Sequence, residues 1–153
     1  MLIMEYRGTL SSAQAFAKSG RLEDWVHSYL KSDGNNREFS DGLKLLDRYF
    51  LGPIKMPLSL FSRCCGPEET MKWKVDADWF EKKVVMLENA IKTDTDMPPL
   101  IVHFVDDEFE LNDGNHRLEA YSRLDSKEIN VIIWITEKSE YELFLSKYSE
   151  FFK

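Results

Sequence analysis

Cysteine is scarce in this sequence. The 153 residues include only two, Cys64 and Cys65, and they are adjacent. Neighbouring cysteines are poorly placed for an unstrained disulfide, and their spacing matches no zinc motif. We therefore predict no metal site and interpret the pair as reduced thiols of an intracellular protein. The alternative is that the two thiols form a reactive vicinal pair.

Long apolar segments and a signal sequence are also lacking. No apolar run approaches the ~18 residues that a membrane span needs. The N-terminal MLIMEYRG is too short for a signal peptide and lacks its basic start. We therefore expect a cytoplasmic protein with no membrane contact.

Positive charge is in short supply as well. The chain has 20 Lys and Arg against 27 Asp and Glu, which gives a net charge of −7. High-affinity DNA binding depends largely on neutralising phosphates with basic side chains, so DNA binding and nuclease activity are the least favoured functions. A small nucleotide needs only a local positive site, and the composition leaves that open.

The composition is that of a folded protein, with 43% hydrophobic and 31% charged residues. Its length suits one domain with a full core. We predict a single domain over 1–153. It would comprise a helical N-terminal extension over 1–53, a core over 54–136 and a C-terminal helix over 137–153.

Local patterns predict the elements of the N-terminal half. Residues 2–7 are predicted as a short strand, and the apolar stripe of RLEDWVHSYLK predicts a helix over 21–31. A second helix is predicted over 41–50, with Ser40 as its N-cap and Gly52-Pro53 as its end. Residues 54–61 are predicted to be extended at a sheet edge because Pro57 cannot donate to a ladder. Residues 62–75 are predicted as a loop or lid.

The C-terminal half shows stronger periodicity. Asp76 is predicted to cap a helix that ends before Pro98-Pro99. The remaining expectations are a hairpin over 100–105 and 108–111, a helix over 116–124, a buried central strand over 129–135 and a helix over 137–150. The order indicates an α+β (mixed α/β) fold, with helices packed on a small mixed sheet.

The most informative motif is the run Asp113-Gly114-Asn115-His116-Arg117, between the hairpin and the next helix. Helix N-termini expose N–H groups with a partial positive charge and therefore bind anions. An arginine there adds a planar fork that suits phosphate. The motif predicts a phosphate or nucleotide site. The structural alternative is a capped connection in which Asp113 caps the helix and Gly114 supplies a permissive backbone.

From Asp78 onward the chain resembles the ParB/sulfiredoxin-like superfamily. The resemblance rests on a tryptophan-bearing helix, PPLIV, a hairpin, LNDGNHRLEAYSRL and INVIIW, and it covers residues 54–136. It implies that Gly114, Asn115, His116 and Arg117 line a site for nucleotide phosphates. Members of the superfamily hydrolyse CTP and clamp on DNA, repair oxidised peroxiredoxins with ATP, or phosphorylate free serine with ADP.

The sequence differs from known members of the superfamily in two ways that argue against two of these activities. Sulfiredoxins carry a catalytic cysteine where this chain has Asn115, and Cys64 and Cys65 lie far away in sequence, so sulfinic acid repair is not expected. ParB proteins carry a helix-turn-helix region after the nucleotide domain, whereas only a short tail follows Trp134 here. Chromosome partitioning is therefore not expected either.

The predicted site follows from these residue types. Arg117 would contact phosphate oxygens, His116 would donate a hydrogen bond, and Asn115 with backbone amides would complete the cradle. Asp113 would hold magnesium through water or orient the turn. Glu68 is a candidate general base in the loop, and Asp113 and His116 are the candidate catalytic residues within the motif.

Other polar and aromatic residues have a plainer interpretation. Glu68, Glu69 and Glu119 are ordinary surface carboxylates in the structural alternative. We interpret the histidines outside the motif, His27 and His103, as structural or exposed. Trp73 and Trp79 could stack on a base, but we favour core packing for both.

Two classes of function remain. The first is an enzyme, a nucleotide-dependent phosphotransferase or nucleoside triphosphatase that uses ATP, ADP or CTP with magnesium. The alternative is a non-catalytic module that senses a nucleotide or phosphorylated small molecule and passes the signal to a protein partner. An enzyme needs a carboxylate that points into the cradle, whereas a sensor does not.

Overall fold

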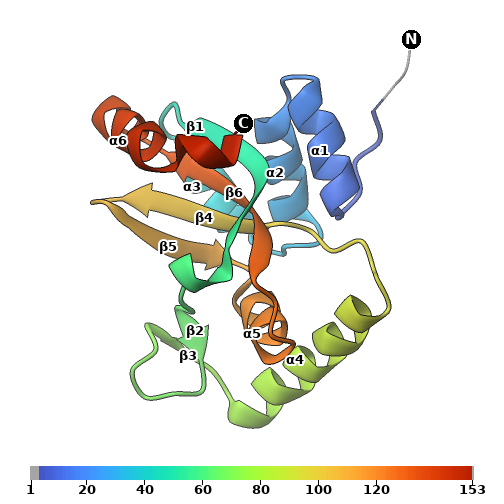
Figure 1. Cartoon of the computed structure of the whole chain (residues 1–153). Coiled ribbons are helices and arrows are strands. Elements are labelled where there is room, and N and C mark those ends of the chain that lie inside the picture. Colours follow the sequence, from blue (N-terminus) through green and yellow to red (C-terminus); the bar gives the residue numbers. More distant parts are fainter. Residues whose placement is uncertain (1–3, 153) are drawn as a thin grey trace.

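The computed structural model describes residues 4–152 and shows an α+β fold around a four-stranded mixed sheet (Figure 1). The strand order is β1 (Tyr49–Pro57), β6 (Glu128–Ile135), β4 (Leu100–Val105) and β5 (Glu108–Asp113). β4 and β6 are parallel, and the other two pairs are antiparallel. The predicted fold class is confirmed, and so are the central position of β6 and the edge position of the strand that contains Pro57.

Alternation along the strands divides the core into two layers. Ile133 of β6 faces a cluster that includes Leu118 of α5 (Asn115–Arg123) and Phe144 of α6 (Lys138–Tyr148). Its neighbour Ile132 faces the opposite cluster, which also contains Trp25 of α2. The helices on that side are α1 (Leu10–Lys18), α2 (Leu22–Lys31) and α3 (Arg37–Leu43).

One helix lies outside these layers. α4 (Ala77–Lys92) packs on α5 through a small cluster of Phe80, Val84 and Ala120, and Figure 1 shows it beside α5 at the edge of the molecule. Asp76 caps α4 through a hydrogen bond from Trp79 N at 2.9 Å, as predicted. α4 is therefore attached to the sheet mainly through α5.

The hairpin, α2, α5 and α6 also lie close to their predicted ranges. The remaining elements are short: the 3-10 turns η1 (Leu58–Leu60) and η2 (Ser149–Phe152), and a parallel pair, β2 (Cys65–Gly66) and β3 (Trp73–Lys74). That pair lies within the segment predicted as a loop.

The predicted helix over 41–50 is wrong. Asn36, not Ser40, caps α3, and Ser40 lies buried inside that helix, 2.7 Å from His27 Nδ1. Gly52 does not end a helix but lies within β1, at a break in its register with β6. A Cβ on Gly52 would lie 2.7 Å from the carbonyl of Val131. Pairing with a distant strand overrode the helical pattern here.

Two further expectations concern the N-terminus. Residues 4–7 form no strand, and residues 2 and 3 lie outside the described part of the chain. α1 was not predicted because its sequence, LSSAQAFAK, has few large apolar residues; Thr9 caps it through a hydrogen bond from Ser12 N. The predicted boundary between extension and core, at residue 53, falls inside β1.

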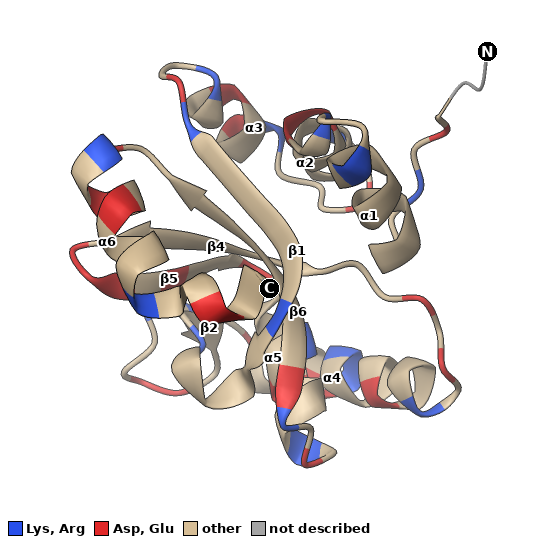
Figure 2. Ribbon diagram, turned by 45° about the horizontal axis from the view of Figure 1, so that its top comes forward, with Lys and Arg blue, Asp and Glu red and all other residues tan. Residues whose placement is uncertain are grey.

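Charge lies mainly on the helices and loops. Figure 2 shows both signs on α4, whereas β4 carries no charged residue and β6 carries only Glu128. Within residues 4–152, no helix is both long enough and apolar enough to cross a membrane.

Candidate functional site

The predicted motif forms a turn that leads directly from β5 into α5. Gly114 has φ +107°, and a Cβ there would lie 2.6 Å from Leu100 Cγ, so a side chain would be strained. The first hydrogen bond of α5 runs from Leu118 N to Gly114 O at 2.8 Å, and no side chain caps the helix. The N–H groups of residues 115–117 therefore have no acceptor within the helix.

Asp113 does not cap α5, so the structural alternative for that residue is wrong. Its Oδ2 instead accepts a hydrogen bond from Arg117 Nη2 at 2.9 Å, which closes an ion pair across the turn. Arg117 is 9% exposed and also donates to Pro99 O and to the hydroxyl of Tyr29, both at 3.2 Å. Its guanidinium is thus held inside the protein, and contact with phosphate stays a prediction.

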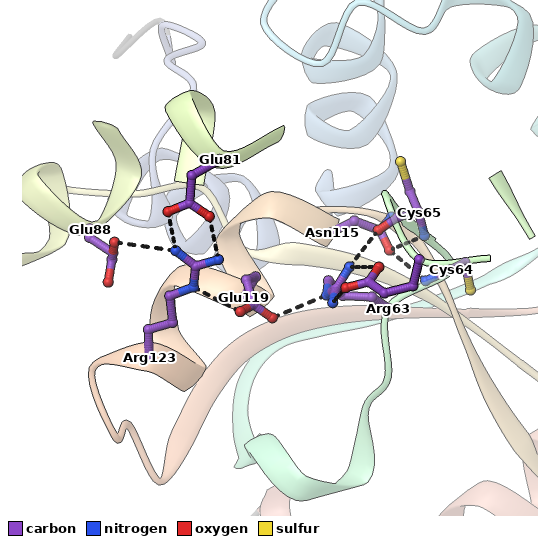
Figure 3. Close-up of polar contacts among 9 residues, drawn as sticks. Arg63, Cys64, Cys65, Glu81, Glu88, Asn115, Glu119 and Arg123 are labelled. Carbon is purple, nitrogen blue, oxygen red and sulfur yellow. Dashed lines mark hydrogen bonds and ion pairs between the residues drawn. The ribbon is translucent and has the colours of Figure 1, made fainter. Parts of the chain in front are cut away.

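Asn115 joins α5 to the loop that carries the cysteines. Its Oδ1 accepts hydrogen bonds from Cys64 N at 2.7 Å and Cys65 N at 3.1 Å, as Figure 3 shows. The cysteines lie 51 and 50 residues before Asn115 in the chain. The sequence carried no signal of this contact. The predicted motif and the vicinal thiols therefore belong to one site.

His116 is held between two aromatic rings of α4. Its ring lies edge-on to Trp79, with centroids 5.1 Å apart, and 5.0 Å from Phe80. Burial is the main cause that lowers the pKa of His116 to about 4. The nearby charges of Lys83, Arg117 and Arg63 also lower this pKa. The imidazole is therefore neutral at neutral pH and can donate one hydrogen bond from one nitrogen.

Arg63 is the centre of a polar network that sequence reasoning missed. It binds Glu68 at 2.6 Å and Glu119 at 3.2 Å, and its guanidinium lies 4.9 Å from the centroid of the Phe80 ring. Glu119 in turn binds Arg123 at 2.8 Å. Figure 3 shows the network continuing from Arg123 to Glu81 and Glu88 of α4. The i,i+4 spacing of Glu119 and Arg123 on one helix was a signal that could have been used. The pairs of Arg63 with Glu119 and of Arg123 with Glu81 join distant segments and leave no periodic pattern in the sequence.

The carboxylates considered as bases are all ion-paired with cations. Glu68 hydrogen-bonds to Arg63, and that contact lowers the pKa of the carboxyl. Glu119 lies between Arg63 and Arg123, and Glu69 pairs with Lys74. A carboxylate with a lowered pKa is a weaker base, so a base role for Glu68 would require its release from Arg63.

Two tryptophans lie on the surface near the turn. Trp73 is 63% exposed and Trp79 is 50% exposed, so the expectation of core packing is wrong for both. Trp79 lies one position outside the apolar stripe of α4, which begins at Phe80. Trp73 lines a cavity of about 250 Å³ together with Cys64 and Asn115. His27 is buried and His103 stacks on Trp134, which agrees with their structural interpretation.

Comparison with known proteins finds a family model that matches part of the chain. Residues 72–146 match the family model of the ParB N-terminal domain. They include α4, β4, β5, α5, β6 and most of α6. This part of the chain therefore matches the ParB N-terminal domain, and the turn from Asp113 to Arg117 lies within the matched segment. Arg63 and Glu68 precede the matched segment.

Solved structures that are similar to the chain include a sulfiredoxin and a ParB-N domain. Sulfiredoxin from Arabidopsis thaliana is 23% identical over 63% of this chain and 97% of its own, with a TM-score of 0.43. A Pnob8-like ParB-N domain is 16% identical over 67% of this chain and 38% of its own, with a TM-score of 0.39. No curated protein matches the chain.

Proposed function

We propose that this protein binds a nucleotide or another phosphorylated ligand at the N-terminus of α5. The observation that carries the proposal is the start of α5, where N–H groups without an acceptor in the helix lie near Lys83 and give a local positive field in a chain of net charge −7. Lys83 lies over the ring of Trp79, which packs against His116, whereas Arg117 and Arg63 are nearby but ion-paired. Such a field attracts anions whatever the total charge of the protein.

The family supports the same location. The segment that matches the ParB N-terminal domain contains the turn, and the superfamily resemblance implies a nucleotide-phosphate site at Gly114, Asn115, His116 and Arg117. The backbone amides at the start of α5 would be the first donors to phosphate oxygens. Gly114 lets the backbone turn closely enough to present them.

In this proposal the side chains have other roles in phosphate binding than those predicted from the sequence. Arg117 is held by Asp113, Pro99 and Tyr29, so in this proposal it positions the turn and adds charge from behind it. Lys83 is exposed and makes no ion pair within residues 4–152, so it is available to meet a phosphate. Trp79 is 50% exposed, with Lys83 Nζ 5.2 Å from the centroid of its ring, and in this proposal the indole stacks on a base.

Catalysis would require more of the site than ligand binding does. A phosphotransferase or nucleoside triphosphatase needs a base and, in most cases, magnesium. No group of three or more metal-binding side chains occurs in the described residues, so magnesium would rely on phosphate oxygens for much of its coordination. Asp113 and Glu68 are both ion-paired, and turnover would require the release of one of them.

The test is a ligand screen by thermal shift, with ATP, ADP, CTP, GTP and pyrophosphate in the presence of magnesium. A ligand at about 100 times its Kd stabilises the fold by about 2.7 kcal/mol, which raises Tm by several degrees. Lys83→Ala should weaken the shift, whereas Lys92→Ala, an exposed lysine in the last turn of α4, should leave it unchanged.

Arg117→Ala would be a poor first variant, because loss of a buried ion pair destabilises the fold itself. The proposal fails if no ligand in the screen stabilises the wild-type protein. Release of phosphate from any nucleotide that binds would identify an enzyme. Binding without turnover would identify a sensing module, for which a protein partner would then be sought.

A further inference from the structure

The guanidinium of Arg63 contacts three groups that hold it in place, and its remaining N–H groups bind one exposed carboxylate, that of Glu68. Its Nε binds Glu119, its Nη1 donates to Cys65 O at 3.1 Å, and its face lies over Phe80. The side chain of Arg63 is 14% exposed, whereas that of Glu68 is 44% exposed. Glu68 accepts from Nη2 at 2.6 Å and from Nη1 at 3.1 Å.

This pairing is asymmetric. If Glu68 left, Arg63 would keep its contacts with Glu119, Cys65 and Phe80 and would stay in place. Within the described chain, Glu68 has no other cationic partner than Arg63. The guanidinium is thus held in an orientation that can bind an anion, and Glu68 is the anion that another one could replace.

The ion pair lies directly against the backbone at Gly66. A Cβ on that residue would come within 2.1 Å of Arg63 Nη1 and 2.5 Å of Glu68 Oε2. The loop therefore leaves room for the pair only because residue 66 has no side chain. The same loop is held to the start of α5 by the hydrogen bonds from Cys64 and Cys65 to Asn115.

We infer that Arg63 is a second anion-binding residue of the α5 site, and that Glu68 occupies its guanidinium until a phosphate group of the ligand displaces it. This inference rests on the proposed function and adds a residue from outside the family segment. Carboxylate and phosphate are the anions that arginine binds through two parallel hydrogen bonds, so one can replace the other. Arg63 binds Glu119 of α5 at 3.2 Å. Its guanidinium and the His116 ring lie 4.9 Å and 5.0 Å from the same Phe80 ring, so the fork lies beside the start of α5.

Displacement of Glu68 from Arg63 would also change its strength as a base. Its carboxyl loses the hydrogen bonds that lower its pKa and becomes a stronger base. The base would thus be released in the presence of bound ligand. In the free protein, the same carboxylate competes with the ligand and weakens its binding.

The experiment compares two neighbouring carboxylates. Pyrophosphate binding is measured by calorimetry for wild type, Glu68→Gln and Glu69→Gln. Both variants remove one negative charge from the same loop, but Glu69 pairs with Lys74 and not with Arg63. Glu68→Gln should bind pyrophosphate about fivefold more tightly than wild type, an effect of the size expected for a partly exposed ion pair. Glu69→Gln should change the Kd by less than about twofold, the scale of a general charge effect.

A third arm tests Arg63 itself. In an Arg63→Gln background, the Glu68→Gln change should give no further gain, because the competition it relieves no longer exists. Circular dichroism and Tm of each variant would show that the fold is retained. The Glu68 and Glu69 pair of variants tests the inference even if Arg63→Gln does not fold.

The outcomes separate this inference from the proposed function. If wild type binds pyrophosphate and the two glutamate variants behave alike, Glu68 does not compete for Arg63 and the inference is overturned, while the proposed function stands. If neither wild type nor any variant binds pyrophosphate or a nucleotide, both fail together. Tighter binding by Glu68→Gln alone supports the inference.

Discussion

Arg117 of α5 and Tyr29 of α2 meet inside the protein. Arg117 Nη1 donates a hydrogen bond to the Tyr29 hydroxyl over 3.2 Å, and the guanidinium carbon lies 5.9 Å from the centre of the ring. Both residues are buried, at 9% and 3% exposure. The helical N-terminal part of the chain therefore packs against the inner side of the turn from Asp113 to Arg117 and holds its arginine in place.

Tyr29→Phe should destabilise the fold by about 1–2 kcal/mol, because it removes an acceptor from a buried charged donor and leaves the ring in place. Urea unfolding would measure the change. Tyr141→Phe is the matched control, since its ring also stacks but its hydroxyl makes no hydrogen bond within residues 4–152. Equal losses in the two variants would contradict the importance of the contact with Arg117.

Gly114→Ala should cost at least ~2 kcal/mol of stability, because φ +107° is strained for any residue with a side chain. The added methyl group would also meet Leu100 Cγ at 2.6 Å and Arg117 Nη2 at 3.1 Å. Gly42→Ala provides the contrast. That glycine lies within α3 with no atom inside 4 Å of its Cβ position. Alanine there should be neutral or stabilise by up to about 1 kcal/mol.

Thermal unfolding of the two glycine variants would give the comparison. If alanine at position 114 were tolerated as well as alanine at position 42, the turn would not have the close packing described here. The result also bears on ligand binding, because the same turn presents the amides at the start of α5.

The sequence predicted best where one local pattern dominates. The stripe of Phe80, Val84, Leu87 and Ile91 with Asp76 before it was enough to place α4, and the apolar run INVIIWI was enough to place β6 at the centre of the sheet. In each case burial and periodicity point to the same element. The Asp-Gly-Asn-His-Arg turn was also located from its neighbours in sequence.

Contacts between distant segments could not be predicted in this way. Tyr49 and Phe50 continue a helical pattern locally, yet pairing with β6 makes them a strand. The side-chain oxygen of Asn115 accepts a hydrogen bond from the backbone N–H of Cys64, 51 residues earlier in the chain, and no local pattern predicts this contact. Arg63 lies in the predicted loop next to Cys64 and Cys65, but its ion pair with Glu119, 56 residues away, left no trace in the local pattern. These interactions depend on the fold having already brought the segments together.

Asn115→Ala should increase the reactivity of the two thiols severalfold. The substitution removes the oxygen that holds the amides of Cys64 and Cys65, so the loop would open more often and expose both sulfurs. The rate of reaction with a disulfide reagent measures this opening directly. Asn36→Ala is the control, because it also deletes an amide that accepts a backbone hydrogen bond, but at the start of α3.

A larger rate for Asn115→Ala than for Asn36→Ala would support the contact, and equal rates would contradict it. Asn115→Asp should restore slow reaction, because a carboxylate oxygen can accept the same two hydrogen bonds. That rescue distinguishes the loss of the hydrogen bonds from a general loss of stability.

His116 should make the protein sensitive to acid. Its pKa is about 4 in the folded protein, below the ordinary value near 6.5 in an unfolded chain. The unfolded state therefore takes up the proton first, and stability present above about pH 6.5 is lost as the pH falls toward 4. The ring is half-buried and partly screened by water, so we expect a loss on the order of 1 kcal/mol rather than the full value of the shift.

The measurement is the free energy of unfolding between pH 4 and pH 8 for wild type and His116→Gln. Carboxylates and the other histidines titrate in both proteins, so the difference between the two curves isolates His116. This difference should change in favour of the variant as the pH falls, because glutamine cannot take up a proton in the unfolded chain. Parallel curves would show that His116 is accessible to protons in the folded protein, and that Trp79 and Phe80 do not shield it from water.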